Sequence, residues 1–348
     1  MQKRFDSIIK GLFPEGETVL LAVSGGIDSM CMADLFLGSG ARFAVANCNF
    51  HLRGEESDGD SEMVRQWCRY HGIEFHCRDF DTKVCAQEKG ISVEMAAREL
   101  RYAWFDSLCC EHGYAALAVA HNSNDNAETM VLNMLRGTGL KGMTGMKLMS
   151  MVPVPGSATP LCRPLLRFSR KEIEEYAAAH EVPFREDSTN AETEYRRNKV
   201  RHLIFPQFEQ INPSFIEALG RDMANLTQVS AVADGWYENA RTGVVSYESA
   251  EEARISVPGL KKAGNVGYML YRLLEPYGFN ASDIASVETL LGSDTVSGKM
   301  FKAGDWQLVS SSSELIVRKV VATSDQVCIV VEGPGLYEFV GVRFSVSV

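Results

Sequence analysis

The feature that most constrains the fold is an alternation of short apolar segments with longer amphipathic ones over the first 140 residues. The apolar segments have the length of buried strands, and those between them have the apolar spacing of helices. We predict strands at residues 18–23, 42–48, 73–77 and 115–120, and helices at residues 28–37, 57–71, 92–112 and 125–136. This alternation predicts an α/β fold, a doubly wound and mostly parallel sheet with helices on both faces. In such sheets ligands bind beyond the carboxyl ends of the strands.

The character of the sequence changes at Asn212-Pro213. The later elements are predicted as a turn-rich stretch at 149–164, helices at 170–180, 195–208, 214–239 and within 259–292, and a hairpin at 298–320. We therefore expect three parts: an α/β domain at residues 1–212, a smaller, mainly helical domain with a terminal hairpin at 213–319, and the start of a truncated or short C-terminal domain at 320–348.

Composition excludes several classes of protein. The 348 residues carry a net charge of −10, and the nine cysteines form no Cys-x-x-Cys pair, so neither a disulfide framework nor a zinc knuckle is indicated. No apolar run approaches the roughly 20 residues that span a bilayer, and the first residues lack a signal-peptide pattern. We expect a cytoplasmic protein with no membrane partner. The acidic charge argues against nonspecific coating of nucleic acid, but it leaves room for a local basic patch.

A glycine pair follows the first strand, in the segment SGGIDS. Glycines remove side-chain bulk, so that backbone N–H groups can converge on an anion, and the following helix adds the favourable charge of its N-terminus. The segment is no Walker A loop, because no Gly-Lys-Ser/Thr follows. A plain strand-to-helix turn with Asp28 as a cap is the alternative. The candidate phosphate-binding residues are Ser24, Gly25, Gly26, Ile27, Asp28 and Ser29.

Basic residues follow at two places near the same edge of the predicted sheet. His51 and Arg53 come after the second strand, where they could face phosphates or a nucleobase. Alone, they are more simply residues of a solvated loop. Arg98 and Arg101 lie three positions apart, on one face of the helix at 92–112. A solvated helix face is again the simpler alternative.

His121, Asp125 and Glu128 follow the fourth strand at spacings of four and three, which would place them on one helix face. Two carboxylates and an imidazole at the end of a strand indicate cation binding, either of Mg²⁺ or of the amine of an amino acid. Zinc fits this set less well. The structural alternative is that Asp125 is an N-cap with Glu128 as its capping-box partner.

A basic cluster lies close to the end of the predicted α/β domain. Its members are Arg196, Arg197, Lys199 and Arg201. They form either a solvated helix face, balanced by Glu192 and Glu194, or a local phosphate-binding patch.

The SGGIDS loop resembles the PP-loop of the N-type ATP pyrophosphatase superfamily, whose sheet is of the adenine nucleotide α-hydrolase-like type. The other segments resemble motifs of the tRNA(Ile)-lysidine synthetase family, in the same order along the chain. These are HLRG at 51–54, AREL-RY at 97–102, the HNSNDNAET segment at 121–129, DSTN at 187–190 and RNKVR at 197–201. Asn124 and Asn126 depart from the family motif, which has Asp and Gln there. The resemblance covers residues 18–213 and weakens towards residue 320.

This resemblance implies a carbon–nitrogen ligase that uses ATP and Mg²⁺. The family adenylates O2 of the wobble cytidine in the isoleucine tRNA with a CAU anticodon, and the ε-amine of free L-lysine then displaces AMP to give lysidine. The resemblance assigns the pyrophosphate to the SGGIDS loop, and Mg²⁺ or the lysine amine to Asp28.

Further roles follow from the same resemblance. Asp125 and Glu128 would bind the lysine ammonium, while His121 and Arg101 would face the adenylate. Arg197 and Arg201 would contact either tRNA phosphate or the lysine carboxylate. His51 and Arg53 are further candidates for substrate binding, and a homodimer is a possible assembly.

Two alternatives stay open. A tRNA thiolase shares the PP-loop, although thiolases that use an iron–sulfur cluster or a persulfide carry Cys-x-x-Cys pairs. A non-catalytic tRNA-binding adaptor would not need the loop together with Asp125 and Glu128.

Overall fold

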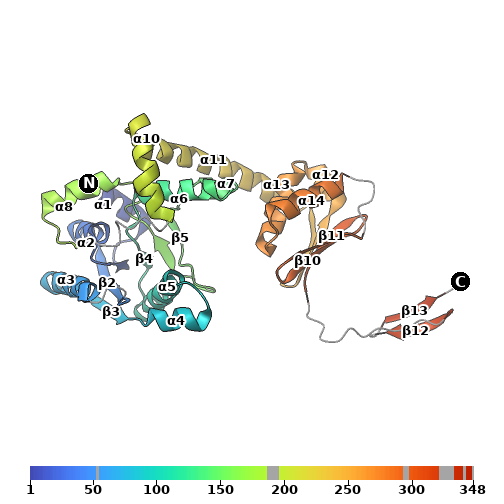
Figure 1. Ribbon diagram of the computed structural model, residues 1–348, viewed down its shortest axis with the longest axis horizontal. Helices are drawn as coiled ribbons and strands as arrows, with labels where there is room; N and C mark the ends of the chain where they lie inside the picture. Colours follow the sequence, from blue (N-terminus) through green and yellow to red (C-terminus); the bar gives the residue numbers. More distant parts are fainter. Residues whose placement is uncertain (52–54, 186–195, 293–297, 321–332, 340–341, 347–348) are drawn as a thin grey trace. The chain divides into compact units, whose positions relative to one another are not determined.

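The computed structural model describes residues 1–51, 55–185, 196–292, 298–320, 333–339 and 342–346. The chain divides into two compact units, Met1–Ala231 and Val232–Val348, which are described separately below (Figure 1). The division falls within the long helix α11 (Phe215–Arg241). The predicted domain boundaries at residues 212 and 319 stay predictions.

The first unit is built on a six-stranded sheet with the order β3-β2-β1-β4-β6-β5. The strands are β1 (Thr18–Ala22), β2 (Arg42–Asn49), β3 (Phe75–Asp79), β4 (Ala116–Ala118), β5 (Met149–Met151) and β6 (Pro160–Cys162). Neighbouring strands are parallel except β5, which pairs antiparallel with β6. The predicted mostly parallel sheet is thus confirmed. The stretch predicted as turn-rich also contributes two short strands, β6 and β5, at one side of this sheet.

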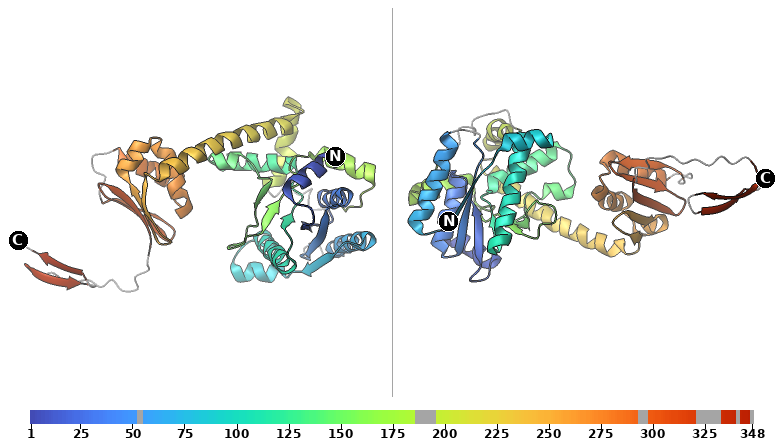
Figure 2. Two further views of the ribbon diagram at one scale, coloured as in Figure 1. Left: turned by 180° about the vertical axis from the view of Figure 1, so that it is seen from behind. Right: turned by 90° about the horizontal axis from the view of Figure 1, so that it is seen from below.

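Helices cover both faces of this sheet (Figure 2). The helices of this part of the chain are α1 (Gln2–Leu12), α2 (Ile27–Ser39), α3 (Glu55–His71), α4 (Thr82–Lys89), α5 (Val93–His112), α6 (Ser123–Leu135), α7 (Leu140–Met143) and α8 (Arg170–His180). Alternate residues of β1 point to opposite faces of the sheet. Val19 and Leu21 pack with α1, α2, α3 and α8, whereas Leu20 packs with α5. This is the doubly wound arrangement expected from the sequence.

A helical segment follows the sheet in three consecutive pieces. They are α9 (Arg196–Lys199), a π-helical turn at Val200–Ile204 and α10 (Phe205–Ile211). Val200 and Phe205 pack against Ala127 and Val131 of α6 in a small separate core. The segment is therefore held against the helix that follows β4.

The second unit contains a five-stranded antiparallel sheet with the order β7-β8-β11-β10-β9. Its strands are β7 (Val245–Glu248), β8 (Glu252–Ser256), β9 (Met300–Ala303), β10 (Trp306–Ser310) and β11 (Glu314–Lys319). Its helices are α12 (Val257–Ala263), α13 (Val266–Leu274), a 3₁₀ turn at Glu275–Tyr277 and α14 (Ala281–Leu291). The sheet is larger than the expected hairpin, because β7 and β8 extend it.

Two further strands, β12 (Gly335–Phe339) and β13 (Val342–Val346), pair antiparallel near the C-terminus. Among the described helices, none combines the length and the apolar character needed to cross a membrane.

Candidate active site

The SGGIDS loop connects β1 to α2, where the sequence predicts an anion site. Gly25 has a φ of +94°, a conformation that strains any residue with a Cβ. α2 begins directly after Gly26, and no side chain caps its N-terminus. The first-turn N–H groups of α2 therefore point out of the helix without intrahelical acceptors, as an anion site requires.

Hydrogen bonds within the loop hold it in shape. Ser29 Oγ donates to the carbonyl of Gly26 (2.9 Å) and accepts from the backbone N–H of Ser24 (3.1 Å). The Ser29 side chain is buried, so its position is fixed by the fold. The loop is thus shaped before any ligand arrives, which lowers the entropic cost of binding one.

A segment after α8 covers one side of the loop. The backbone N–H of Arg185 donates to the carbonyl of Gly25 (3.0 Å). The Nε atom of Arg185 lies 2.8 Å from Oδ1 of Asp60 on α3. The sequence did not single out Arg185 or Asp60. Together they fix the carbonyl of Gly25, so that its peptide orientation does not depend on the loop alone.

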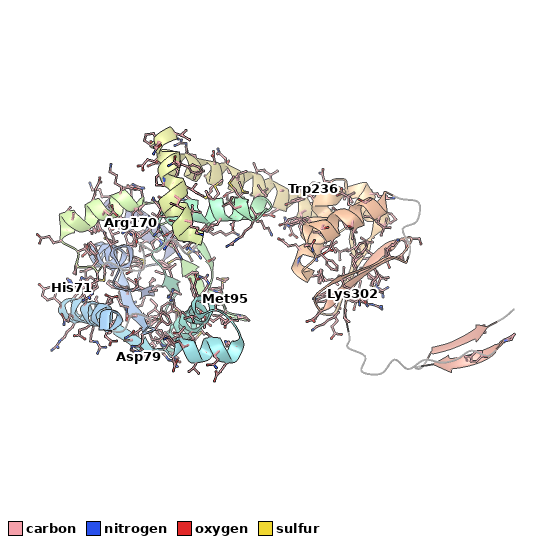
Figure 3. All side chains as sticks on the ribbon, in the orientation of Figure 1. His71, Asp79, Met95, Arg170, Trp236 and Lys302 are labelled. Carbon is pink, nitrogen blue, oxygen red and sulfur yellow. The ribbon has the colours of Figure 1, made fainter. Side chains whose placement is uncertain are left out.

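Asp28, in the first turn of α2, connects the loop to two other elements. Its Oδ1 accepts a hydrogen bond from Asn122 Nδ2 (2.9 Å), and its Oδ2 accepts one from Arg170 Nη1 (2.5 Å). Arg170 is the first residue of α8 and is labelled in Figure 3. Burial raises the pKa of Asp28, and the Arg170 cation opposes that rise.

The N-cap of α6 is not the residue that the structural alternative assigned to it. The N-cap is Asn122, not Asp125, and its side chain accepts from the backbone N–H of Asp125 (3.1 Å). Asp125 Oδ2 in turn accepts from the backbone N–H of Asn122 (3.0 Å), which completes a capping box. Glu128 takes no part in the cap, so its burial needs another explanation.

Glu128 is fully buried on α6 and pairs with two arginines. Its Oε1 accepts from Arg201 Nε (2.7 Å), and its Oε2 lies 3.3 Å from Arg197 Nε. Arg201 Nη2 also lies 3.3 Å from Oδ1 of Asp125. Burial raises the pKa of Glu128, while the hydrogen bond from Arg201 opposes that rise. The structure therefore brings together four of the predicted site residues, namely Asp125, Glu128, Arg197 and Arg201.

Three buried polar atoms in this region have no hydrogen-bond partner among the described residues. They are Oε2 of Glu128, Nδ1 of His121 and Nε of Arg163. Burial lowers the pKa of His121 to about 4, with Arg163, Arg197 and Arg98 contributing in the same direction. His121 is therefore neutral at pH 7. Buried polar atoms are normally paired, so unpaired ones mark places where a ligand can supply the missing partner.

The other predicted residues lie apart from this carboxylate pair. His51 has a φ of +50° and contacts Asp58 (3.3 Å) and Asp79 (2.9 Å). The guanidinium of Arg101 lies 5.0 Å from the ring centre of Phe50. Arg98 is the residue of α5 within electrostatic range of His121. Arg53 lies outside the described residues.

A cavity of about 360 Å³ opens at the carboxyl ends of β2 and β3. Its wall includes Phe50 and Phe80, whose rings stack at 5.5 Å, together with His51 and Asp79. An aromatic wall with a few polar groups suits a planar ligand.

Sequence reasoning did not place Asn122, Arg163, Arg170 or Arg185 among the catalytic, cofactor-binding or substrate-binding residues. One signal was available for Asn122, because an Asn with an Asp three positions later is a capping-box pattern. The contacts of the three arginines could not be predicted, since their partners lie far away in the sequence.

Comparisons with known proteins find relatives of both parts of the chain. Residues 1–208 match the family described as the PP-loop domain, and residues 248–320 match the family described as the TilS substrate binding domain. A solved U34-tRNA thiolase, NcsA from Methanococcus maripaludis with its [4Fe-4S] cluster, is 18% identical. The alignment has a TM-score of 0.54 and covers 65% of this chain and 78% of that chain, a likeness of fold alone.

Curated relatives resemble both units. A tRNA(Ile)-lysidine synthase of Porphyromonas gingivalis strain W83 is 42% identical over 88% of this chain and 64% of its own length. A protein of the same name from Bacteroides thetaiotaomicron is 37% identical over 89% of this chain and 69% of its own length. The chain thus spans about two thirds of the length of these relatives.

Proposed function

The chain belongs to the tRNA(Ile)-lysidine synthase family, and we propose that it makes lysidine in the isoleucine tRNA with a CAU anticodon. The observation that carries this proposal is the buried Glu128, whose Oε2 accepts no hydrogen bond among the described residues and is ion-paired with Arg197 at 3.3 Å, while Arg201 contacts both Glu128 and Asp125. A buried carboxylate oxygen that accepts no hydrogen bond is suited to receive one from an ammonium group.

The reaction has two steps. O2 of the wobble cytosine attacks the α-phosphorus of ATP, and pyrophosphate leaves. The ε-amine of lysine then attacks C2 and loses a proton, while the bond from C2 to the adenylated oxygen breaks and AMP leaves. The protein must hold two anionic groups and an amine in line, so most of the catalysis is positioning and charge stabilisation.

The SGGIDS loop is the proposed site for the pyrophosphate part of ATP. The uncapped N-terminus of α2 supplies N–H donors, and a Cβ built on Gly26 would meet no atom closer than 3.7 Å. Phosphate oxygens can therefore approach the backbone closely.

Asp28 is the proposed ligand for the Mg²⁺ that accompanies ATP. Each of its carboxylate oxygens accepts one hydrogen bond and keeps one further lone pair, so the group fits one position of a magnesium shell. Phosphate oxygens and water would supply the other ligands, and the negative charge of the phosphates would offset the nearby Arg170 cation. The ion would neutralise charge on the phosphates.

Asp125 and Glu128 are the proposed site for the lysine amine. Arg201 and Arg197 already contact these carboxylates, so we assign them to the lysine pocket rather than to tRNA phosphate. Their guanidinium groups oppose the rise that burial causes in the pKa of Glu128. They also place positive charge where the lysine carboxylate needs a partner.

His121 and Arg101 are the proposed contacts of the adenylate. His121 is neutral and its Nδ1 has no partner, so it can hydrogen-bond a substrate oxygen or a nitrogen without adding charge. The cavity beside Phe50 and Phe80 is the proposed site for a nucleobase, with Arg101 against Phe50 and His51 at the rim. Arg53 remains a substrate-binding proposal by family resemblance.

The tRNA would contact basic side chains around this edge. Exposed candidates in the first unit are Arg136, Lys141, Lys147, Arg167 and Lys171. The domain at residues 248–320 would help to select the tRNA. A cytoplasmic location agrees with this substrate and with the eight described cysteines, all of which are free thiols. The homodimer stays a prediction.

Pyrophosphate release from ATP tests the proposal against its alternatives. We expect release that depends on the tRNA, and AMP formation that also depends on lysine. A thiolase would instead require a sulfur donor, and an adaptor would release nothing. Within the described part of the chain, no three cysteines come together as iron–sulfur ligation would require.

A further inference from the structure

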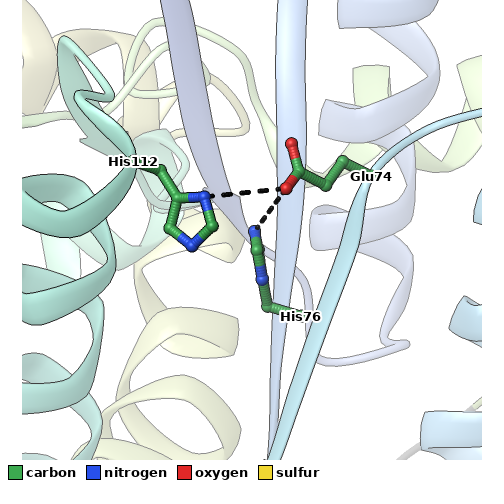
Figure 4. A group of neighbouring side chains, drawn as sticks. All are labelled: Glu74, His76 and His112. Carbon is green, nitrogen blue, oxygen red and sulfur yellow. Dashed lines mark ion pairs between the residues drawn. The ribbon is translucent and has the colours of Figure 1, made fainter.

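A second cluster of ligand-type side chains lies at the opposite edge of the sheet in the first unit. Glu74 directly precedes β3, His76 is the second residue of that strand, and His112 is the last residue of α5 (Figure 4). The SGGIDS loop lies at the carboxyl end of β1, whereas this cluster lies at the amino end of β3, which runs parallel to β2 and β1. Nothing in the proposed reaction uses these residues.

The three side chains point their ligand atoms at one another. Oε1 of Glu74 lies 3.5 Å from Nε2 of His76 and 3.7 Å from Nδ1 of His112. All three atoms lie within 4.8 Å of one another. Neighbouring ligands of a tetrahedral zinc ion are about 3.3 Å apart, given zinc–ligand bonds of about 2.0–2.1 Å. Two of the three spacings are therefore within a few tenths of an ångström of that geometry.

Neighbouring rings fix the two imidazoles. The ring of His112 stacks on Tyr114 at a centroid distance of 5.3 Å, and it lies 4.7 Å from the ring of His76. The hydroxyl of Tyr114 shares a hydrogen bond of 2.7 Å with Nε2 of His76. Because the rings are already ordered, little conformational entropy remains to be lost when a metal binds.

We propose that Glu74, His76 and His112 form a binding site for Zn²⁺, with water as the fourth ligand. Two imidazoles and one carboxylate are a common set for zinc with an open position, whereas Mg²⁺ and Ca²⁺ select oxygen ligands. Zinc takes the lone pair of His76 Nε2 and so displaces the Tyr114 hydroxyl from that nitrogen. The ion connects the start of β3 to the end of α5 and stabilises the first unit.

Titration calorimetry with ZnCl₂ tests this site on the full chain after treatment with a chelator. We expect the chain to bind one equivalent of zinc. Glu74→Gln should lower the affinity at least about tenfold, and His112→Ala should abolish binding. The Glu74 side chain is 56% exposed, so Glu74→Gln should leave the fold intact. Zinc should raise the Tm of the unaltered protein but not that of His112→Ala. Co²⁺ in place of zinc should show tetrahedral d–d absorption.

Two control variants separate this site from adventitious binding. His71→Ala removes a histidine outside the cluster, and Cys110→Ser removes an exposed thiol close to His112. Both should bind zinc as the unaltered chain does. Absence of zinc binding, binding that survives both Glu74→Gln and His112→Ala, or loss in Cys110→Ser would overturn the proposal.

Tyr114→Phe tests the competing hydrogen bond. The substitution keeps the ring that stacks on His112 but removes the hydroxyl that bonds Nε2 of His76. We expect tighter zinc binding, because no hydrogen bond has to be broken. Weaker binding would show that zinc does not use this nitrogen in the way proposed.

Discussion

Arg201 donates a hydrogen bond of 2.7 Å from Nε to Oε1 of Glu128, which lies 73 positions earlier in the chain. The π-helical turn at Val200–Ile204 places Arg201 here, and turns of this kind recur at functional sites. Glu128 is fully buried, and the hydrogen bond from Arg201 opposes the rise that burial causes in the pKa of Glu128. Four predictions follow from this site and its surroundings.

Glu128→Gln keeps the size of the side chain and removes its charge. We expect the KM for lysine to rise by about tenfold to a hundredfold, because a charge-assisted hydrogen bond contributes about 1.5–3 kcal/mol. The KM for ATP should change little. Steady-state kinetics with lysine as the varied substrate measures this effect, and the exposed Glu62 on α3 offers Glu62→Gln as a control. An unchanged KM for lysine would remove Glu128 from the pocket.

The pH dependence of lysine binding should depend on the same carboxylate. Burial raises the pKa of Glu128 above the ordinary value of 4.5, so protonation begins at a higher pH than for a free glutamate. Protonation removes the charge that attracts the amine, and the KM for lysine should therefore rise as the pH falls. Burial lowers the pKa of His121 to about 4, so His121 stays neutral at mildly acidic pH and does not cause the effect. The acid-side rise should disappear in Glu128→Gln, and its persistence there would point to another group.

Gly25→Ala should affect both stability and ATP binding. Gly25 has a φ of +94°, and a Cβ there would lie 3.4 Å from Cβ of Asp60. We expect a loss of about 1–2 kcal/mol in the free energy of unfolding and a higher KM for ATP. Gly40→Ala is the matched control, because Gly40 has a φ of +70° at the other end of α2 with open space around it. Denaturant unfolding should show a lower free energy of unfolding in both variants. An equal rise of the KM for ATP in both would contradict a specific role of the loop.

Asn122→Ala should separate capping from catalysis. It removes the N-cap of α6, at a cost of about 0.5–2 kcal/mol, and also the hydrogen bond to Asp28. Asn280 caps α14 with the same capping box in the second unit, so Asn280→Ala is the control. Both variants should unfold at lower denaturant concentration, but only Asn122→Ala should lower kcat. Equal kcat values of the two variants would show that Asn122 acts only as a helix cap.

The sheet could be predicted because its strands are buried on both faces and read as apolar runs. β1, for example, is apolar from Val19 to Ala22 and has helices against both of its sides. β7 could not be predicted, because Ser246, Tyr247 and Glu248 are exposed and leave no apolar alternation. The helix at residues 195–208 was expected, but its π-helical turn was not.

The carboxylates of the site could be predicted together with their partners Arg197 and Arg201, but the contacts of Asp28 with Asn122 and Arg170 could not. Asp28, Asp125 and Glu128 follow strand ends, and parallel strands bring such positions to one edge. Arg170 meets Asp28 across 142 positions of sequence. Contacts of this kind depend on how α8 packs against α2, and no local sequence pattern predicts that packing.

The most direct test of the proposed function is mass spectrometry of the anticodon-loop nucleosides of the CAU-anticodon isoleucine tRNA after incubation with the protein. The account predicts that lysidine replaces the wobble cytidine only when ATP and lysine are both present, and that Glu128→Gln reduces its yield at limiting lysine. Unmodified cytidine in the complete reaction, or a thiolated nucleoside in its place, would contradict it.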